Sequence, residues 1–264
     1  MLLPNAIYNI DCREGMIQIP KESIDLLLTD PPFGIDFQKV GSQYNRKQKE
    51  LGYNYIEIPE NEYYEFTLDW IKAAYEVMKP SASGFIFSGW NNLSDILNVL
   101  AEVGFRVVNH IIWKYQFGVF TKNRFTSSHY HILYVTKISE KDDKTRVFNR
   151  LPEYSDSKVP GKLYFEDVWY INRDYQKGGK KTPTRLPLEV TDKCLLIGSK
   201  EGDTILEPFC GSGTVILSCI QHNRQFYGFE LSKPIFDVAE TRIKEFKQQL
   251  DNKKYKLDNF LKKV

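Results

Sequence analysis

The chain has 264 residues, 42% of them hydrophobic, and a formal net charge of only +2 at pH 7. This length and balance indicate one large globular domain, or one domain with an insertion, and exclude a disordered, fibrous or polycationic protein. No apolar run approaches the roughly 20 residues of a membrane span. The N-terminus lacks the basic start and long apolar stretch of a signal peptide. We therefore expect a cytoplasmic protein with no membrane partner.

Apolar runs and helical spacing alternate along the chain, with Pro80, Gly104 and Gly213 marking element ends. The pattern predicts strands at 6–10, 23–30, 84–89, 105–115, 129–137, 203–207 and 226–230. It predicts helices at 13–18, 62–78, 91–104 and 187–198, then one after Gly213 and a long one from Lys233.

This alternation is typical of an α/β fold: a doubly wound, mostly parallel seven-stranded sheet. The stretch between the strands at 105–115 and 129–137 is too short for a crossover helix, so one of the two is expected to run antiparallel. Residues 138–182 lose the pattern and are expected to be an inserted segment within a single domain spanning 1–264.

The second strand runs into the segment Asp30-Pro31-Pro32-Phe33. An acid at that place lies at the carboxyl edge of the sheet, where ligands bind. The prolines stiffen the turn and leave the carbonyls of Asp30 and Pro31 without competing local donors. A rigid rim of acceptors beside the flat ring of Phe33 suits a planar base bearing an exocyclic amino group. The alternative is a strand-ending turn of no consequence.

Residues 207–214 (Glu-Pro-Phe-Cys-Gly-Ser-Gly-Thr) join a strand to a helix through two glycines that permit a sharp turn and close ligand approach. They match neither the three-glycine dinucleotide fingerprint nor a phosphate loop. Glu207 would repel a phosphate and suits a cation, whereas Glu230, ending the next strand, can accept hydrogen bonds from ribose hydroxyls. A ribose, an ammonium and a sulfonium describe S-adenosylmethionine. An ordinary strand–helix turn with an exposed acid is the alternative.

Together the two motifs indicate direct methyl transfer. Accepting both hydrogens of an aromatic amine, at Asp30 and at the Pro31 carbonyl, favours a pyramidal nitrogen and disperses the positive charge of the transition state. No Pro-Cys pair is present to attack a pyrimidine ring carbon. The four cysteines, Cys12, Cys194, Cys210 and Cys219, also lack Cys-x-x-Cys spacing, so we expect buried free thiols and no metal site.

The ordered motifs "TDPPF", "EPFCGSGT" and "FYGFELS" resemble the DNA amino-methyltransferases, in the permuted arrangement called the β group. The resemblance covers nearly the whole chain. It implies transfer from S-adenosylmethionine, leaving S-adenosylhomocysteine, with catalysis by Asp30, Pro31, Pro32 and Phe33. It implies that Asp11 and Cys12 lie near the cofactor adenine. The remaining cofactor contacts that it implies are Asp30, Thr184, Arg185, Pro187, Glu207, Pro208, Phe209, Gly211, Ser212, Gly213, Thr214, Glu230 and Leu231.

Three positions depart from the family pattern. Phe33 stands where tyrosine is usual, which keeps the ring and loses a hydroxyl. Glu207 replaces the more usual Asp, and the residues before Pro187, Thr-Pro-Thr-Arg-Leu, differ from the usual His-Pro-Thr-Gln-Lys. Asp30, rather than serine, resembles the adenine-N6 members more than the cytosine-N4 members.

A base inside a duplex cannot reach such a pocket, so the target is flipped out or single-stranded. DNA contacts are expected from the loop at 38–50 and from the aromatic, basic stretch at 115–130. Residues 138–182 are expected to recognise the target sequence. The candidate DNA-binding residues are Lys39, Arg46, Lys47, Lys122 and Arg124, although solvated surface charge explains each as well.

We therefore predict a DNA adenine-N6 methyltransferase of a restriction-modification system, or an orphan modification enzyme. Transfer to cytosine N4 or to RNA is the nearest alternative, followed by a non-catalytic cofactor-binding subunit. A dinucleotide oxidoreductase is a distant third, opposed by Glu207 and the missing third glycine. The family resemblance also brings a homodimer and a partner restriction endonuclease into consideration.

Overall fold

The computed structural model describes residues 1–34, 58–116, 118, 122–123, 125–137, 145–173 and 185–261, with side chains in the last helix described to residue 252. Its strands are β1 (Ala6–Tyr8), β2 (Ile24–Thr29), β3 (Met78–Ser88), β4 (Arg106–Lys114), β5 (His129–Thr136), β6 (Val168–Tyr170), β7 (Thr204–Glu207) and β8 (Gln225–Phe229). Its α-helices are α1 (Cys12–Met16), α4 (Tyr63–Val77), α5 (Leu93–Val103), α6 (Leu188–Gly198), α7 (Thr214–Gln221) and α8 (Lys233–Leu261). Short 3-10 helices are η2 (Glu60–Glu62) and η4 (Pro152–Tyr154).

The strands of the described residues form one sheet in the order β1-β8-β7-β2-β3-β5-β4-β6. Only β5 runs antiparallel to its neighbours β3 and β4, which confirms the doubly wound, mostly parallel fold. The sheet has eight strands rather than seven, because β6 joins its edge parallel to β4. Three residues are too few to show a period-2 pattern, so the sequence did not reveal this strand.

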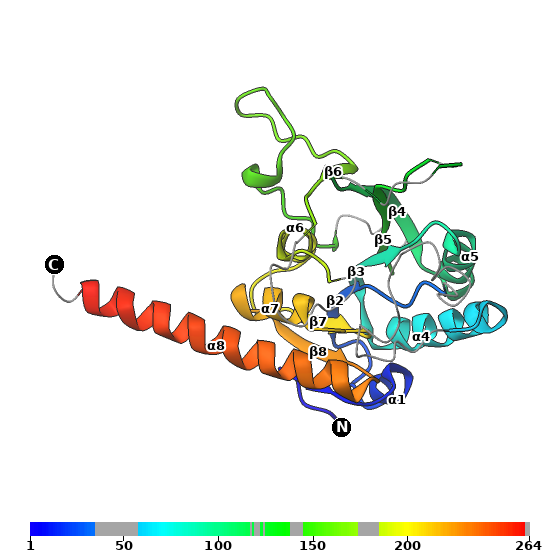
Figure 1. Ribbon diagram of the computed structural model, residues 1–264, viewed down its shortest axis with the longest axis horizontal. Helices are drawn as coiled ribbons and strands as arrows, with labels where there is room; N and C mark the ends of the chain where they lie inside the picture. Colours follow the sequence, from blue (N-terminus) through cyan, green and yellow to red (C-terminus); the bar gives the residue numbers. More distant parts are fainter. Residues whose placement is uncertain are drawn as a thin grey trace.

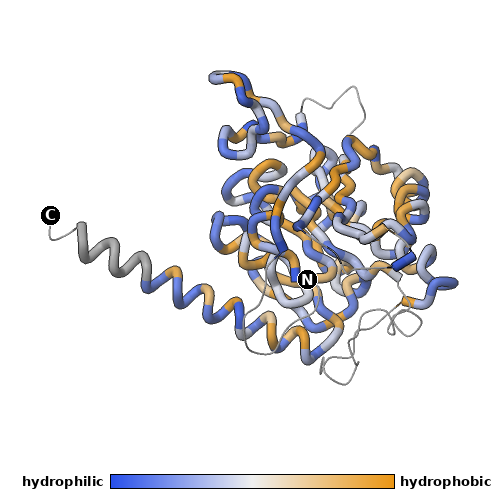
Figure 2. Tube along the Cα trace, turned by 45° about the horizontal axis from the view of Figure 1, so that its top comes forward, coloured by the Kyte–Doolittle hydropathy of each residue, from blue (hydrophilic) through white to orange (hydrophobic). Residues whose placement is uncertain are grey.

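Helices cover both faces of the sheet (Figure 1). On one face, α1, α4 and α5 bury side chains such as Trp70 and Leu100 against β2, β3 and β5. On the other, α6, α7 and the start of α8 pack residues such as Val190 and Ile216. Figure 2 shows hydrophobic residues gathered inside the body, whereas α8 alternates hydrophobic and hydrophilic residues where it extends beyond it. The apolar run predicted for β2 is buried on both faces, as expected.

The helix ends follow the local sequence. α5 ends at Gly104, whose φ of 101° suits glycine. α4 ends at Val77, and β3 begins at Met78, earlier than the strand predicted at 84–89. Pro80 lies where the register between β2 and β3 shifts. Its missing N–H costs nothing there, so proline is tolerated inside the strand.

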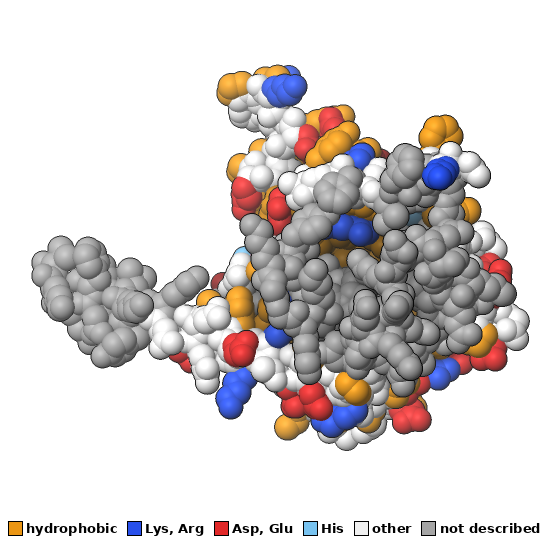
Figure 3. All heavy atoms as spheres, in the orientation of Figure 1, with side chains coloured by type: hydrophobic (Ala, Val, Ile, Leu, Met, Phe, Trp, Pro, Cys, Tyr) orange, Lys and Arg blue, Asp and Glu red, His pale blue; other side chains and the backbone are white. Residues whose placement is uncertain are grey.

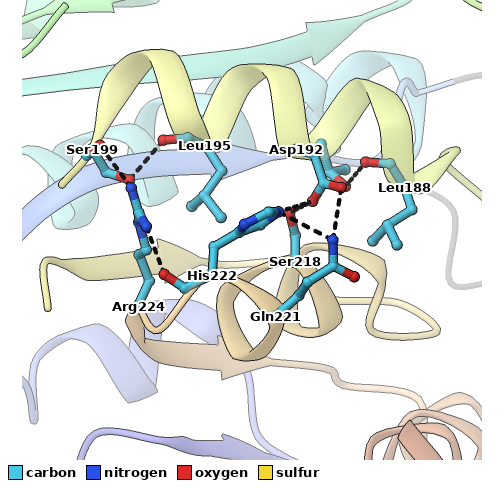
Figure 4. A network of polar contacts seen from close by, with 9 residues as sticks. Leu188, Asp192, Leu195, Ser199, Ser218, Gln221, His222 and Arg224 are labelled. Atoms are coloured by element: carbon cyan, nitrogen blue, oxygen red, sulfur yellow. Dashed lines mark hydrogen bonds and ion pairs between the residues drawn. The ribbon is translucent and has the colours of Figure 1, made fainter. Parts of the chain in front are cut away.

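A polar network ties α6 to α7 and the chain after it (Figure 4). The Ser218 hydroxyl donates to the Asp192 carboxylate, and Nε2 of His222 lies 3.1 Å from the same Oδ1. Arg224 donates from Nε to Oγ of Ser199 at 3.1 Å and from Nη2 to its carbonyl at 2.9 Å. Ser218 is fully buried and bonds to the acid rather than to the histidine, so the trio is structural and not a hydrolase triad.

All four cysteines are buried free thiols, as expected. Among the described residues, no grouping of three His, Cys, Asp or Glu side chains could hold a metal ion. In the same part of the chain, every helix is too short or too polar to cross a membrane.

The topology places two strand ends side by side. From β2 the chain proceeds through α4 to the neighbouring β3, and from β7 it proceeds through α7 to β8 on the opposite side. β2 and β7 are adjacent and parallel, so the strand order reverses between them. In open α/β sheets, ligands bind at this switch point, outside the carboxyl ends of the strands.

Candidate active site

Asp30 follows β2 directly at the switch point. The residue is half-buried, and its Oδ1 atom is fully buried without a hydrogen-bond partner among the described residues. Burial raises the pKa of Asp30 to about 7, against the opposing effect of the positive charge on Arg173. A buried, unsatisfied carboxylate oxygen is costly. At a strand end in a ligand crevice, it indicates an acceptor that waits for a donor from the substrate.

The turn after Asp30 is held from two sides. Nδ2 of Asn92 donates to the carbonyl of Phe33 at 2.7 Å. Gly34 has a φ of +62°, and a Cβ atom there would lie 2.5 Å from Cδ2 of Tyr63. On the other side, a Cβ atom at Gly89 would lie 3.3 Å from the Phe33 ring. Two glycines and one asparagine thus constrain the turn that follows Asp30, and the sequence alone indicated none of the three.

Phe33 belongs to an aromatic row along the carboxyl edge. Its ring centroid is 5.6 Å from that of Tyr130, at the start of β5. Tyr130 lies 5.7 Å from both Trp113 and Tyr115, at the end of β4. The guanidinium carbon of Arg173 lies 3.9 Å from the Tyr115 centroid and 5.0 Å from that of Tyr130. These spacings suit aromatic contact and cation–π attraction.

Glu207 ends β7 and is almost fully buried. Its Oε1 accepts from the Thr29 hydroxyl at 2.7 Å and from the Phe209 backbone N–H at 3.0 Å. Burial raises the pKa of Glu207 to about 8, helped by the negative charges of Asp30 and Glu230. The bond from Thr29 joins the two strand ends of the switch point.

The glycine loop between β7 and α7 takes the conformation that its sequence requires. Gly211 and Gly213 have φ values of 49° and 85°, in the region that favours glycine. Arg242 of α8 donates to the carbonyl of Ser212 and, at 2.8 Å, to its hydroxyl. The ring of Phe209 packs edge-on against Trp70, with the centroids 5.4 Å apart. The loop is thus braced by α8 and α4.

Glu230 follows β8, the next strand end along the edge. Burial raises its pKa, and backbone N–H groups of Ser232 and Gly211 oppose that rise. The N–H of Ser232 is 2.7 Å from Oε1 of Glu230. Nδ2 of Asn9 donates to the carbonyls of Glu230 and Leu231, at 2.8 and 3.0 Å, which ties the chain after β8 to the chain after β1.

The acids at this edge fit a cationic ligand better than a phosphate. Asp30, Glu207 and Glu230 all have raised pKa values, and Glu207 feels both of the others as like charges. A bound cation would relieve that repulsion, whereas a phosphate would add to it. Together with the glycine loop, these three carboxyl groups suit the ribose, ammonium and sulfonium of S-adenosylmethionine.

Other predicted cofactor residues lie around the same loop or farther off. The Asp11 carboxylate caps α1 and is paired with Arg13 at 2.8 Å, which lowers the Asp11 pKa. The Cys12 side chain is buried in the core, whereas the Asp11 carboxylate is partly exposed. Pro187 is buried and caps α6, and Nε of Arg185 is buried without a partner among the described residues.

The remaining predicted residues divide into two groups. Pro208 and Thr214 flank the glycine loop, Leu231 is half exposed after Glu230, and Lys122 is exposed. The predicted contacts outside the described residues are Thr184, Lys39, Arg46, Lys47 and Arg124. On the face drawn in Figure 3, basic and acidic side chains of the described residues are interspersed rather than segregated.

A family model described as DNA methylase matches residues 24–241. The type II methyltransferase M.HpaI of Haemophilus parainfluenzae is 30% identical over 239 residues, which cover 87% of this chain and 71% of that protein. The type II methyltransferase M2.DpnII of Streptococcus pneumoniae is 27% identical over 242 residues, covering 90% and 88%.

Solved structures support the fold. The protein TTHA0409 of Thermus thermophilus, in complex with S-adenosyl-L-methionine, superimposes with a TM-score of 0.65 at 18% identity and covers 91% of this chain and 93% of its own. The complex of M1.HpyAVI with SAM gives a TM-score of 0.63 at 23% identity, with 90% and 98% covered. The cytosine-N4-specific PvuII DNA methyltransferase gives 0.64 at 18%, with 90% and 85% covered.

Proposed function

The chain belongs to the N6/N4 DNA methylase family, and from that premise we propose that it methylates the N6 amino group of adenine in DNA, with S-adenosylmethionine as methyl donor. The observation that carries the proposal is the Asp30 carboxylate, whose Oδ1 is buried and without a hydrogen-bond partner among the described residues at the switch point. Such an oxygen is suited to receive an N–H that only a ligand brings.

In this mechanism Asp30 accepts one hydrogen of the target amine and the Pro31 carbonyl accepts the other. Phe33 contacts the face of the base, and Tyr130 backs that ring. When bound, S-adenosylmethionine supplies a methyl group that its sulfonium has already activated. Asp30 stabilises the positive charge that develops on the amine nitrogen, which then loses its proton to solvent. Alignment contributes most of the remaining acceleration, and no covalent enzyme intermediate is needed.

The residues proposed to hold the cofactor come from neighbouring strand ends. Glu207 offers a carboxyl group whose ionised form the cationic part of the cofactor would favour, and the glycine loop offers backbone N–H groups with room for close approach. Glu230 accepts hydrogen bonds from the ribose hydroxyls. Removing the Glu230 carboxylate should weaken cofactor affinity in calorimetry, and an affinity equal to that of the wild type would refute this assignment.

Asp30 is the reason for preferring adenine N6 over cytosine N4. The chain carries Asp where cytosine-N4 members of the family commonly carry serine. Cytosine N4 remains the second candidate, because a cytosine-N4-specific enzyme is among the proteins that share the fold. Both bases offer an exocyclic amine to the same acceptors, so the site geometry serves either one.

Residues 138–182 are proposed to recognise the bases around the target. β6 adds this segment to the sheet beside β4, close to the aromatic row. Tyr164 and Tyr170 are 58% and 80% exposed there, which suits base stacking or backbone contact. Replacing residues 145–167 with those of a relative of different specificity should change the methylated sequence without changing the methylated atom.

The decisive experiment expresses the chain in a methylation-free bacterial host. Digestion of the DNA to nucleosides, followed by mass spectrometry, should show N6-methyldeoxyadenosine, and methylation-sensitive sequencing should give the site. Asp30→Ala is the matched control: it should abolish methylation while cofactor binding and the melting temperature persist. N4-methyldeoxycytidine would replace the adenine proposal with the cytosine one, and full activity of Asp30→Ala would refute the mechanism.

A role in restriction-modification is proposed from the type II methyltransferases among the relatives. DNA methylated by this chain should then resist an endonuclease that cuts the same sequence. Cleavage at methylated sites would contradict that role. Light scattering at micromolar concentration would decide between monomer and homodimer.

A further inference from the structure

Arg173 follows β6, in the segment proposed for target recognition, and the backbone before it is hydrogen-bonded to β4 and the residues just after β4. The N–H of Ile171 donates to the Lys114 carbonyl at 3.1 Å, and Nε1 of Trp113 donates to the Ile171 carbonyl at 2.8 Å. The N–H of Arg173 itself bonds to Oε1 of Gln116 at 3.1 Å. The backbone of this turn is therefore held to the end of β4 by three hydrogen bonds.

The Arg173 side chain lies over two tyrosine rings. Its guanidinium carbon lies 3.9 Å from the Tyr115 centroid and 5.0 Å from that of Tyr130. Tyr115 is buried and Tyr130 is partly buried, so packing supports the surface beneath the guanidinium. A cation held in this way keeps its charge near the site without needing a direct carboxylate partner.

Charged groups at this edge act in opposite directions. Arg173 favours the ionised form of Asp30, whereas the negative charges of Asp30 and Glu230 raise the pKa of Glu207. The Tyr130 ring links Arg173 to the turn that begins at Asp30, because its centroid lies 5.0 Å from the Arg173 guanidinium carbon and 5.6 Å from the Phe33 centroid. Desolvation also opposes ionisation of Asp30. Arg173 is thus the one group among these that offsets both the burial of the carboxylate and its acidic neighbours.

We propose that Arg173 is a positioning residue for the methyl transfer: its guanidinium, held over Tyr115 and Tyr130, keeps the Asp30 carboxylate ionised to accept the target amine. This inference rests on the proposed role of Asp30. A protonated carboxyl would present a donor to the amine and lose an acceptor. The recognition segment would therefore supply a part of the catalytic machinery as well as base contacts.

The test is the pH dependence of the single-turnover methylation rate, measured from pH 5.5 to 9.5 on unmethylated plasmid DNA at saturating S-adenosylmethionine. In the wild type the rate should rise with pH and reach half its maximum at or below pH 7. Arg173→Gln keeps a planar polar group and removes the charge, so its midpoint should move to higher pH. For each pH unit by which the midpoint rises, the rate below the midpoint should fall about tenfold. At pH 9 the rate of Arg173→Gln should return to that of the wild type.

Arg173→Lys retains the charge and should retain the wild-type midpoint, even if DNA binds less tightly. Tyr115→Leu removes the surface that holds the guanidinium and should move the midpoint in the same direction as Arg173→Gln. Arg150→Gln is the matched control, because Arg150 also lies over an aromatic ring, that of Phe165 at 5.6 Å. Its midpoint should equal that of the wild type.

An unmoved midpoint in Arg173→Gln would overturn the inference, whatever the loss of rate. If the rate then fell equally at every pH and the salt dependence of DNA binding weakened, Arg173 would be a phosphate contact instead. Asp30→Ala separates this failure from that of the proposed function. An active Asp30→Ala variant would remove the premise, whereas an inactive one with an unmoved Arg173→Gln midpoint would reject the role of Arg173 alone.

Discussion

Replacing Glu207 by glutamine should stabilise the protein and lower its affinity for the cofactor. The glutamine carbonyl can keep the bonds from Thr29 and Phe209, at 2.7 and 3.0 Å, and the volume hardly changes. What the substitution removes is the ability to ionise. Glu207 is almost fully buried and faces the negative charges of Asp30 and Glu230, which together raise its pKa to about 8. Glu207 therefore lowers the free energy of unfolding of the cofactor-free protein.

The sign and size follow from proton linkage. The ordinary pKa of a glutamate here is 4.5, so between pH 4.5 and about 8 the folded protein holds a proton that the unfolded chain has lost. The free energy of unfolding of the wild type therefore falls as pH rises through this interval. At ~1.4 kcal/mol per pH unit, the loss by pH 7 is at most ~3 kcal/mol. Part of this loss comes from repulsion that Asp30, Glu207 and Glu230 share. We therefore expect Glu207→Gln to raise the free energy of unfolding by about 1–3 kcal/mol.

Urea unfolding without cofactor, at pH 5, 6, 7 and 8, measures this gain. The advantage of Glu207→Gln should be small at pH 5 and should grow up to pH 8, with a melting temperature raised by roughly 3–10 °C at pH 8. Calorimetry at pH 8 should show cofactor affinity reduced by about tenfold or more, because one counter-charge to the cation is gone. Glu245→Gln, an exposed change on α8, is the control and should show neither effect. A gain that does not grow with pH would refute the reasoning.

Four variants at three other positions test the turn that follows Asp30. Asn92→Ala removes the 2.7 Å bond to the Phe33 carbonyl and should lower the methylation rate by about fivefold, as expected for ~1 kcal/mol, with cofactor affinity in calorimetry unchanged; a parallel loss of affinity would contradict this. Gly34→Ala sets a Cβ atom against Tyr63 at positive φ, so chemical denaturation should show a loss of about 1–3 kcal/mol, and wild-type stability would show that the turn is not strained. Phe33→Tyr should keep most of the methylation rate and Phe33→Ala should lose it, because the ring is proposed to contact the base; equal rates would exclude stacking.

Much of the fold could be predicted because it depends on local signals. The buried strand at 23–30, the helix end at Gly104 and the long helix from Lys233 all rest on hydrophobic period or backbone preference, and all were found near the predicted bounds. The antiparallel β5 followed from the short connection to β4. β6 was missed, because three residues show no period and their pairing with β4 is a long-range event.

In the candidate site, too, residues marked by local sequence could be predicted and residues brought in by long-range contacts could not. Asp30, Glu207 and Glu230 could be named in advance, because each follows a recognisable strand and acids at strand ends meet at one edge. Their partners could not be named. Asn92 and Arg173 reach the site through crossovers and edge pairing, and no spacing along the chain encodes that proximity.

Apart from the short edge strand β6, the sequence by itself determined the elements, their order and the acids at their ends, since hydrophobic period, Gly and Pro positions and turn chemistry act over a few residues. Only the tertiary structure decided how those acids behave. It buried Oδ1 of Asp30 without a hydrogen-bond partner among the described residues, bonded Glu207 to Thr29, and brought Arg173 over two tyrosines. Desolvation and charge–charge interactions depend on the distances between groups in space, and folding alone sets those distances.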